Sequence, residues 1–167
     1  MSAIDKVLDS NQRYADGFNQ GGLPGNPTRL RLAVVTCMDS RLHLSKLLGL
    51  ELGDAHIIRN AGGIVTEDVL RSLVVSCQIA GTQEVMIINH TECAMLTFKD
   101  EELAAKLRRE TGEAPVTPTR FYAFTDLEEN VRQQMRELRS HPWIPESILV
   151  RGFIYNVDTG RLLEVSA

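Results

Sequence analysis

Apolar residues recur along the chain in short stretches that are rich in β-branched side chains and bounded by polar or glycine-containing segments. Stretches of this length and composition favour buried strands over helices. The predicted strands cover residues 30–35, 56–58, 84–88 and 148–157. The last segment, residues 156–165, has the pattern of a hairpin turn that leads into a final antiparallel edge strand.

Helical spacing of apolar residues separates these strands. Three apolar residues at such spacing predict a first helix over residues 3–16, which is followed by a linker rich in glycine and proline at residues 17–28. Further helices are predicted at residues 43–49, 66–81, 94–110 and 126–141. Thr125 and Glu128 have the spacing of a capping box at the start of the last helix.

Strands that alternate with helices imply right-handed crossovers and a mostly parallel sheet with helices on both faces. We therefore predict an α/β fold with about four parallel strands, a C-terminal antiparallel edge strand and flanking helices. The length of 167 residues fits a single domain over residues 1–167, in which residues 1–28 form an N-terminal helical arm and linker.

Composition narrows the class of protein. Hydrophobic residues make up 43% of the chain and charged residues 24%, as in soluble globular domains. A net charge of −4 without a basic cluster argues against a nucleic-acid partner. The chain has neither a membrane-spanning apolar run nor the apolar segment of a secretory signal, so we expect a cytoplasmic protein that does not bind membranes. Its three cysteines then indicate core, catalytic or metal-bound thiols rather than disulfides.

The side chains that can bind a metal lie at the ends of two predicted strands, where ligands gather in open α/β sheets. Cys37 closes the first strand, and His90 and Cys93 follow the third. The His90–Cys93 spacing is about one helical turn, so the imidazole and the thiolate can point at one centre. Two sulfurs and one nitrogen suit zinc, and three protein ligands leave the fourth position open, as in catalytic zinc sites.

These residues resemble the motifs of the β-class carbonic anhydrases. Residues 37–41 (CMDSR) resemble the C-x-D-S-R element of that family, residues 90–93 (HTEC) its H-x-x-C element, and residues 59–63 (RNAGG) its R-N-x-[AG] segment. The resemblance to compact members of the family runs from about residue 30 to the C-terminus. It implies one zinc ion per chain and reversible hydration of carbon dioxide to bicarbonate and a proton through zinc-bound hydroxide. Ala94 stands where the family usually has glycine, and we expect its methyl group to narrow the pocket or tilt the following helix.

Asp39 and Arg41 are the predicted catalytic residues beside the metal. The guanidinium can hold the carboxylate in a charge-assisted pair, which leaves one carboxylate oxygen to accept a hydrogen bond from the hydroxide. In part of the resembling family the pair breaks and the aspartate closes the site as a fourth ligand, so Asp39 is also a metal ligand in such a closed state. We expect the activity to fall at lower pH, where water competes less well as hydroxide.

Other polar residues have plainer interpretations. The segment at residues 59–63 has the pattern of a glycine turn that opens a helix, and we take it as mainly structural. Cys77 lies in the apolar helix and is expected to be a core residue. His43, His56 and His141 are candidates for proton transfer to bulk solvent, but nothing in the sequence selects one of them.

Two rival functions and an assembly follow from the same residues. Close relatives of the family hydrolyse carbon disulfide or carbonyl sulfide on the same scaffold, and turnover of the three gases would distinguish these enzymes. The second rival is a non-catalytic zinc or thiol sensing module, in which Asp39 binds the zinc permanently as its fourth ligand. This alternative gives Arg41 no role, which argues against it. The resemblance also implies a homodimer or tetramer in which the N-terminal helix lies across the neighbouring subunit.

Overall fold

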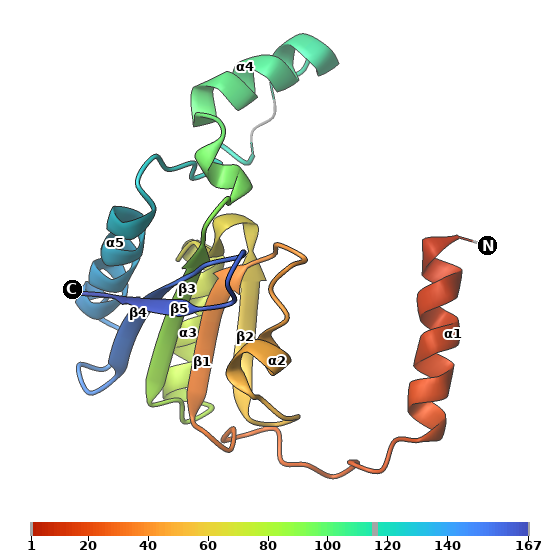
Figure 1. The fold of residues 1–167 in the computed structure, drawn as a ribbon. Coiled ribbons are helices and arrows are strands. Elements are labelled where there is room, and N and C mark those ends of the chain that lie inside the picture. The colour runs from red at the N-terminus through yellow and green to blue at the C-terminus, as the bar shows by residue number, and fades with distance from the viewer. Residues whose placement is uncertain (1, 115–116, 167) are drawn as a thin grey trace.

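The structure is a computed structural model that describes residues 2–114 and 117–166. Its centre is one five-stranded sheet in the order β2-β1-β3-β4-β5 (Figure 1). The strands are β1 Leu32–Cys37, β2 Ala55–Asn60, β3 Glu84–His90, β4 Leu149–Tyr155 and β5 Leu162–Val165. The first four are parallel and β5 pairs antiparallel with β4, which confirms the predicted fold class.

The α-helices of the described residues lie close to the predicted ranges. They are α1 Ala3–Asp16, α2 Leu44–Leu48, α3 Glu67–Gln78, α4 Asp100–Thr111 and α5 Leu127–Ser140. Two short 3-10 helices, η1 Ala61–Gly63 and η2 Ala94–Leu96, follow β2 and β3.

Two predictions about helix starts are wrong in detail. The predicted helix at residues 94–110 divides into η2 and α4, because the acidic residues that favour a helix N-terminus begin only at Asp100. The last helix is capped by Asp126 rather than by a box of Thr125 and Glu128. The Asp126 carboxylate accepts a hydrogen bond from the backbone N–H of Glu129 at 2.9 Å, which satisfies a free donor of the first turn.

The main core lies between the sheet and the two helices α3 and α5. Alternate residues of β1 and β3, among them Val35 and Ile87, face Leu73 of α3 and Met135 of α5, and all four are at most 1% exposed. Gly152 of β4 lets α5 approach, because a Cβ there would lie 2.4 Å from a side-chain carbon of Val131. This packing fixes the strands whose carboxyl ends carry the candidate metal ligands.

The opposite face of the sheet is covered less completely than predicted. There Val34 and Ile88 pack against Leu44 of the short helix α2, while flanking apolar residues such as Phe153 stay partly exposed. A five-residue helix is too small to cover five strands. Within residues 2–114 and 117–166, helices therefore cover one face more completely than the other.

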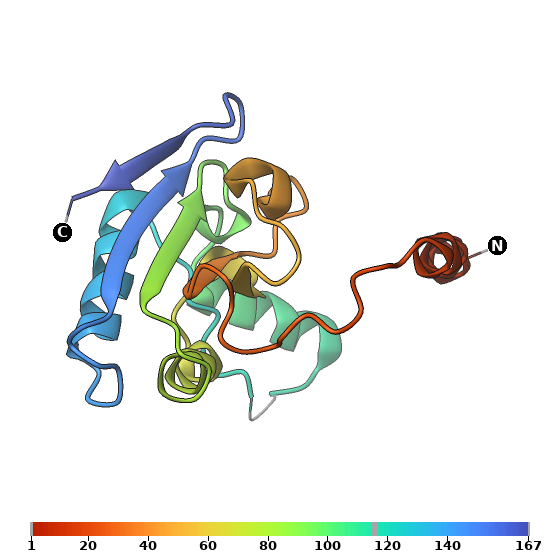
Figure 2. The same cartoon turned by 90° about the horizontal axis from the view of Figure 1, so that it is seen from below.

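Helix α1 stands apart from the rest of the molecule in both cartoon views (Figures 1 and 2). It contains no buried residue, although Ile4, Val7 and Leu8 form an apolar stripe that is 60–68% exposed. Helix α1 confirms the predicted N-terminal helix, and the boundary of the arm and linker at residue 28 stays a prediction. No helix within residues 2–114 and 117–166 has the length and apolarity needed to cross a bilayer.

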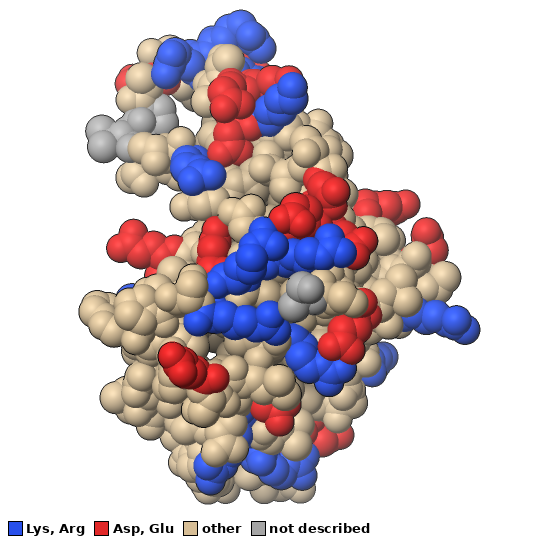
Figure 3. All heavy atoms as spheres, turned by 90° about the vertical axis from the view of Figure 1, so that its left-hand side faces the viewer, with Lys and Arg blue, Asp and Glu red and all other residues tan. Residues whose placement is uncertain are grey.

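The surface formed by α5 and the β4–β5 edge carries charges of both signs. Figure 3 shows a band of basic side chains on this side, bordered by acidic ones. Arg132, Arg136 and Arg151 each form an ion pair with a glutamate. Such mixed charge is typical of a solvated surface.

Candidate metal centre

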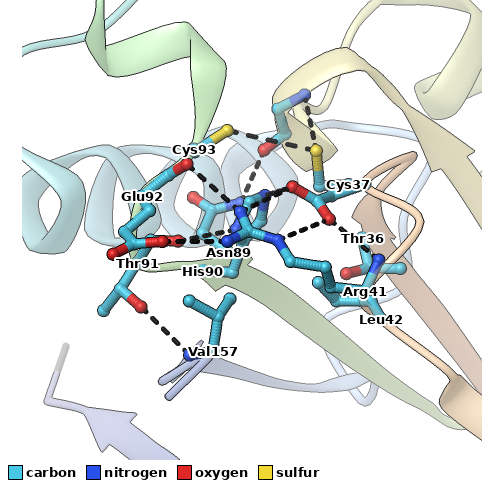
Figure 4. A network of polar contacts seen from close by, with 12 residues as sticks. Thr36, Cys37, Arg41, Leu42, Asn89, His90, Thr91, Glu92, Cys93 and Val157 are labelled. Carbon is cyan, nitrogen blue, oxygen red and sulfur yellow. Dashed lines mark hydrogen bonds and ion pairs between the residues drawn. The ribbon is translucent and has the colours of Figure 1, made fainter.

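Cys37, His90 and Cys93 come together at the carboxyl edge of the sheet. Cys37 is the last residue of β1, and His90 is the last residue of the neighbouring strand β3. One ligand atom from each of the three residues lies within 4.8 Å of the other two, and the residues are at most 5% exposed. The structure thus unites the three predicted metal ligands in one buried cluster (Figure 4).

The distances and free atoms of this cluster fit a tetrahedral metal ion. The sulfur atoms of Cys37 and Cys93 are 4.0 Å apart, and two sulfurs bound to one zinc ion at about 2.3 Å would be about 3.8 Å apart. His90 Nδ1 lies 2.8 Å from the carbonyl oxygen of Thr91, which can only accept, so Nδ1 carries the proton in the neutral ring. The other ring nitrogen, Nε2, is buried without a hydrogen-bond partner among the described residues. Its lone pair is available to a metal.

The short distances between the three side chains shift their pKa values. The side-chain contact with Cys93 lowers the pKa of Cys37 to about 4, and backbone N–H groups of Asp39 and Gly62 contribute. The contact with Cys37, together with burial, raises the pKa of Cys93. Burial lowers the pKa of His90, but contacts with Cys37 and the Thr91 carbonyl outweigh this effect and leave the pKa raised. Without a metal, the two thiols therefore share one proton, and a bound cation would replace it.

The turn η1 lies directly against the end of β1. The backbone N–H of Gly62 donates to Cys37 Sγ at 3.3 Å. Gly63 has a φ of +65°, and a Cβ there would lie 2.8 Å from the backbone nitrogen of Cys37. The Asn60 side chain closes the turn through hydrogen bonds of 2.8 Å to the backbone N–H and carbonyl of Ile64. Glycine is required here because the turn must approach the backbone of a metal-ligand candidate.

Asp39 and Arg41 form the predicted pair beside the cluster. Arg41 Nε and Nη2 donate to the two carboxylate oxygens of Asp39 at 3.0 and 2.9 Å, and the Arg41 backbone N–H adds a third bond. These bonds lower the pKa of Asp39 well below its ordinary value. Asp39 Oδ2 lies 3.8 Å from His90 Nε2, so the carboxylate borders the space between the ligand atoms. The carboxylate is thus held ionised at the edge of the cluster.

Arg41 has a second acidic partner that the sequence analysis did not identify. Arg41 Nη1 donates to Glu92 Oε2 at 2.9 Å, and Nη2 lies 3.3 Å from the Glu92 carbonyl oxygen (Figure 4). Glu92 has a φ of +56°, which is uncommon for a residue with a side chain. The only sequence signal for this role is its place inside the H-x-x-C element.

Arg59 holds the loop that carries Asp39. Its guanidinium donates to the carbonyl oxygens of Cys37, Asp39 and Leu42 at 2.9, 2.7 and 3.2 Å. Three bonds from one planar group tie the ends of this loop together. The contacts agree with the structural role predicted for residues 59–63.

Apolar residues from the following segments wall the cluster. Met95 is buried against Cys37 and Cys93, and Phe98, Phe121 and Phe124 pack around them. A neighbouring cavity of about 400 Å³ is lined in part by Phe98 and Phe124. Such walls lower the local dielectric and strengthen the electrostatic effects within the site.

The carboxylate of Asp100 holds one of these walls in place. It accepts hydrogen bonds from the backbone N–H groups of Phe121, Tyr122 and Ala123 at 2.8–3.1 Å. No local pattern in the sequence indicated this contact, because the partners are more than 20 residues away.

Ala94 directly follows the cluster at the start of η2, and Cys77 lies in α3. Ala94 is exposed at the start of η2 and is not among the residues with positive φ, so a residue with a side chain is accommodated there. Cys77 packs partly buried against the main core, and burial raises its pKa, which agrees with the predicted core role.

The three remaining histidines lie on other elements. His56 is paired in register with Ala33, four residues before Cys37, which places it about 13 Å along the strands from the cluster. Its Nδ1 lies 2.7 Å from Ser76 Oγ. His43 and His141 flank α2 and α5. His56 is therefore no direct partner of the cluster.

Comparisons with known proteins agree with this geometry. A family profile described as carbonic anhydrase matches residues 32–162, which include the whole cluster. The β-carbonic anhydrase 1 of Mycobacterium tuberculosis is 42% identical over 166 residues, with 99% of each chain covered. A crystal structure of carbonic anhydrase from Streptococcus mutans superposes with a TM-score of 0.92 at 48% identity and covers 99% of both chains. The carbon disulfide hydrolase of an Acidianus species is 34% identical over 181 residues, with 95% of this chain and 89% of the relative covered.

Proposed function

The chain belongs to the β-class carbonic anhydrase family, and from this premise we propose that it catalyses the reversible hydration of carbon dioxide to bicarbonate and a proton at a bound zinc ion. The observation that carries the proposal is the buried cluster of two thiols and one imidazole whose ligand atoms lie within 4.8 Å of one another. The carboxylate–guanidinium pair at its edge supports catalysis over a purely structural metal site.

The donor set fits one zinc ion per chain. Cys37 Sγ, Cys93 Sγ and His90 Nε2 would hold the ion, since thiolates and imidazole are its preferred ligands. When bound, zinc supplies the Lewis acidity that allows a water molecule to ionise near neutral pH. The Thr91 carbonyl keeps the proton of His90 on Nδ1 and raises the basicity of the ligating nitrogen.

Asp39 is proposed to orient the reacting water, and Arg41 to hold Asp39. Arg41 donates one side-chain hydrogen bond to each carboxylate oxygen of Asp39, which leaves further lone pairs free. These lone pairs can accept a hydrogen bond from a water O–H in the space beside His90 Nε2. The three hydrogen bonds between the two residues favour the open arrangement over one in which Asp39 would bind the metal itself. Arg41 thereby acts as the residue that keeps the fourth metal position free.

A stopped-flow assay of carbon dioxide hydration, run across pH on protein of measured zinc content, tests this proposal. Asp39→Ala and Arg41→Ala should keep one zinc per chain and lower kcat/KM by about 10- to 100-fold. Asp68→Ala and Arg71→Ala form a matched control, because this exposed aspartate–arginine pair on α3 has similar N–O distances of 2.9–3.0 Å but lies outside the site. Unchanged rates in the Asp39 and Arg41 variants would favour a sensing module, as would a rate that is flat across pH.

The rival gases are tested on the same preparation. The carbon disulfide hydrolase compared above is 34% identical, against 42% for the β-carbonic anhydrase, which supports carbon dioxide as the substrate. Carbon dioxide turnover should exceed that of carbon disulfide and carbonyl sulfide. Faster hydrolysis of a sulfur-containing gas would assign the chain to the rival function.

We also propose that the protein forms a homodimer, or a tetramer of two such dimers, in a reducing cytoplasmic compartment. The exposed apolar stripe of α1 and the partly covered sheet face support association with a second copy. The three cysteines are all unpaired in the structure, which supports the reducing compartment.

A further inference from the structure

A chain of side-chain amides runs from helix α5 to the turn η1. Gln134 Nε2 lies 3.3 Å from Asn130 Oδ1, and Asn130 Nδ2 lies 2.8 Å from Asn89 Oδ1. Asn89 Nδ2 in turn donates to the carbonyl oxygen of Gly62 at 2.8 Å. The first and last amides, Gln134 and Asn89, are 3% and 1% exposed, so the chain crosses the interior of the protein.

The direction of every hydrogen bond in this chain is determined by its two ends. At one end the Gly62 carbonyl can only accept, so Asn89 must present its N–H₂ group there and its oxygen toward Asn130. At the other end the backbone N–H of Val65 can only donate, and it meets Gln134 Oε1 at 2.6 Å. The backbone groups at the two ends therefore fix the orientation of all three amides. Turning any one of them over, so that its oxygen and nitrogen change places, would leave a buried donor or acceptor without a hydrogen-bond partner.

Both ends of the chain meet the same turn. Asn89 binds the carbonyls of Gly62 and Gly63, and Gln134 binds the N–H of Val65 just beyond them. The Gly62 carbonyl and the Gly62 N–H lie on the two peptide planes that meet at the Gly62 Cα, so fixing the carbonyl limits the rotation by which the N–H could turn away. Restraint of these carbonyls and of Val65 therefore restrains the Gly62 N–H, which points at Cys37 Sγ from 3.3 Å.

We propose that Asn130 and Gln134 are positioning residues of the metal centre, which act through Asn89 to aim the Gly62 N–H at the Cys37 sulfur. An N–H donor at a metal-bound thiolate draws electron density from the sulfur and reduces its donation to the metal. In a site with two thiolates, this leaves more positive charge on the ion for the activation of water. The inference deepens the proposed function and depends on it for the presence of the metal.

Spectra of the cobalt(II)-substituted protein and the rate of zinc release to a chelator test the inference. Asn130→Leu and Asn130→Ala remove the middle amide, and Asn130 is only half-buried, which favours folding of both variants. The thiolate-to-cobalt charge-transfer band should move to longer wavelength, because a sulfur that has lost its N–H donor holds its electrons less tightly. Zinc release should become about tenfold faster, because a Cys37 thiolate that has lost its N–H donor is more basic and takes up the proton that frees it from the metal more readily.

Gln133→Leu is the matched control, because Gln133 is the exposed neighbour of Gln134 on α5 and bonds only to Glu137 within the described side chains. It should leave both readouts unchanged. Unshifted cobalt bands and unchanged zinc release in both Asn130 variants, with normal metal content and cooperative unfolding, would overturn this inference alone. Absence of stoichiometric metal from the unaltered protein would overturn the proposed function as well.

A measurement on the unaltered chain makes the test independent of variant folding. In isotope-labelled protein loaded with an NMR-active cadmium isotope, the amide proton of Gly62 should show scalar coupling to the metal through Cys37 Sγ. A Gly62 amide without such coupling, in a protein whose cadmium signal shows two bound sulfurs, would also overturn the inference.

Discussion

Protons compete with the metal at each of the three candidate ligands. Cys37 has a pKa lowered to about 4, mainly by the hydrogen bond with Cys93, so near neutral pH it is already a thiolate. Cys93 has a raised pKa for the converse reason and keeps its proton. His90 also has a raised pKa, so its proton persists to higher pH than that of a free imidazole.

The zinc affinity of the metal-free protein should therefore rise with pH. Binding displaces one proton, from Cys93, above the pKa of His90, and two protons below it, so the affinity changes by about tenfold per pH unit for each displaced proton. Competition with a chelator across mildly acidic to mildly alkaline pH measures this slope. Cys77→Ser is the control, since Cys77 lies in α3 and not in the cluster, and should keep the same slope. An affinity independent of pH would contradict the assignment of the ligands.

Gly63 and Gly49 allow the cost of backbone conformation to be separated from the cost of contact. Both have a φ of +65°, but a Cβ at Gly49 meets nothing within 4 Å, whereas one at Gly63 meets the backbone of Thr36 and Cys37 at 2.8 Å. Gly49→Ala should lower the free energy of unfolding by about 1–2 kcal/mol. Gly63→Ala should lower it by about 3 kcal/mol or more and also reduce the zinc content. Equal losses in chemical denaturation would contradict the close approach of η1 to β1.

Helix α4 and the segment before α5 form the least anchored part of the site. Helix α4 has no buried residue, and the wall around Phe121 and Phe124 has no strand of its own. The Asp100 carboxylate joins α4 to this wall by accepting three hydrogen bonds from backbone N–H groups. They also lower the pKa of Asp100 against the opposing effect of burial. The stability that Asp100 contributes is therefore present above the ordinary aspartate pKa and is lost as the pH falls through the lowered one.

Asp100→Asn should detach this wall in part. In the asparagine side chain an NH₂ group, which is a donor, replaces one of the two carboxylate oxygens and faces a backbone N–H, which is also a donor. For a half-buried group, this mismatch should lower the free energy of unfolding by about 1–2 kcal/mol. Chemical denaturation at neutral pH should show this loss, and kcat/KM should fall because the apolar wall no longer excludes water. Glu101→Gln, on the same helical turn, should cost only a few tenths of a kcal/mol. A loss in the Asp100 variant no larger than in this control would contradict the anchoring role.

The whole molecule exposes two apolar surfaces that a compact subunit would bury. One is the stripe of Ile4, Val7 and Leu8 on α1, and the other is the sheet face around Phe153 that α2 covers only in part. A 14-residue helix that buries none of its residues is marginal in water, so α1 needs a partner surface. The proposed homodimer would supply one.

Substitution of two residues of the stripe tests this assembly. Ile4→Ser combined with Leu8→Ser should lower the mass measured by light scattering toward that of one subunit, because the stripe would lose its apolar contact area. Asn11→Ser on the same helix is the control and should leave the mass unchanged. A monomeric unaltered protein, or a double variant of unchanged mass, would contradict the role of α1.

Periodicity was sufficient for most of the fold, because strand and helix patterns depend on neighbouring residues. The four parallel strands, the antiparallel edge strand and the arm lie where apolar spacing predicts them. It was insufficient where a local pattern competes with a distant contact. The wall held by Asp100 is an example, since its backbone partners at residues 121–123 follow α4 in the sequence. The helix starts at Asp100 and Asp126 depend instead on local charge and capping.

By itself the sequence identified Cys37, His90 and Cys93 as side chains that could hold a metal and predicted the pairing of Asp39 with Arg41, because these residues lie in short motifs whose spacing limits what they can bind. Only the tertiary structure decided that β1 lies beside β3, which brings the two motifs to one point. It also decided the second partner of Arg41 and the amide chain from α5 to Gly62. The reason is physical, because the contacts of Arg41 with Glu92 and of Asn130 with Asn89 join residues 51 and 41 positions apart and exist only once the strands have paired.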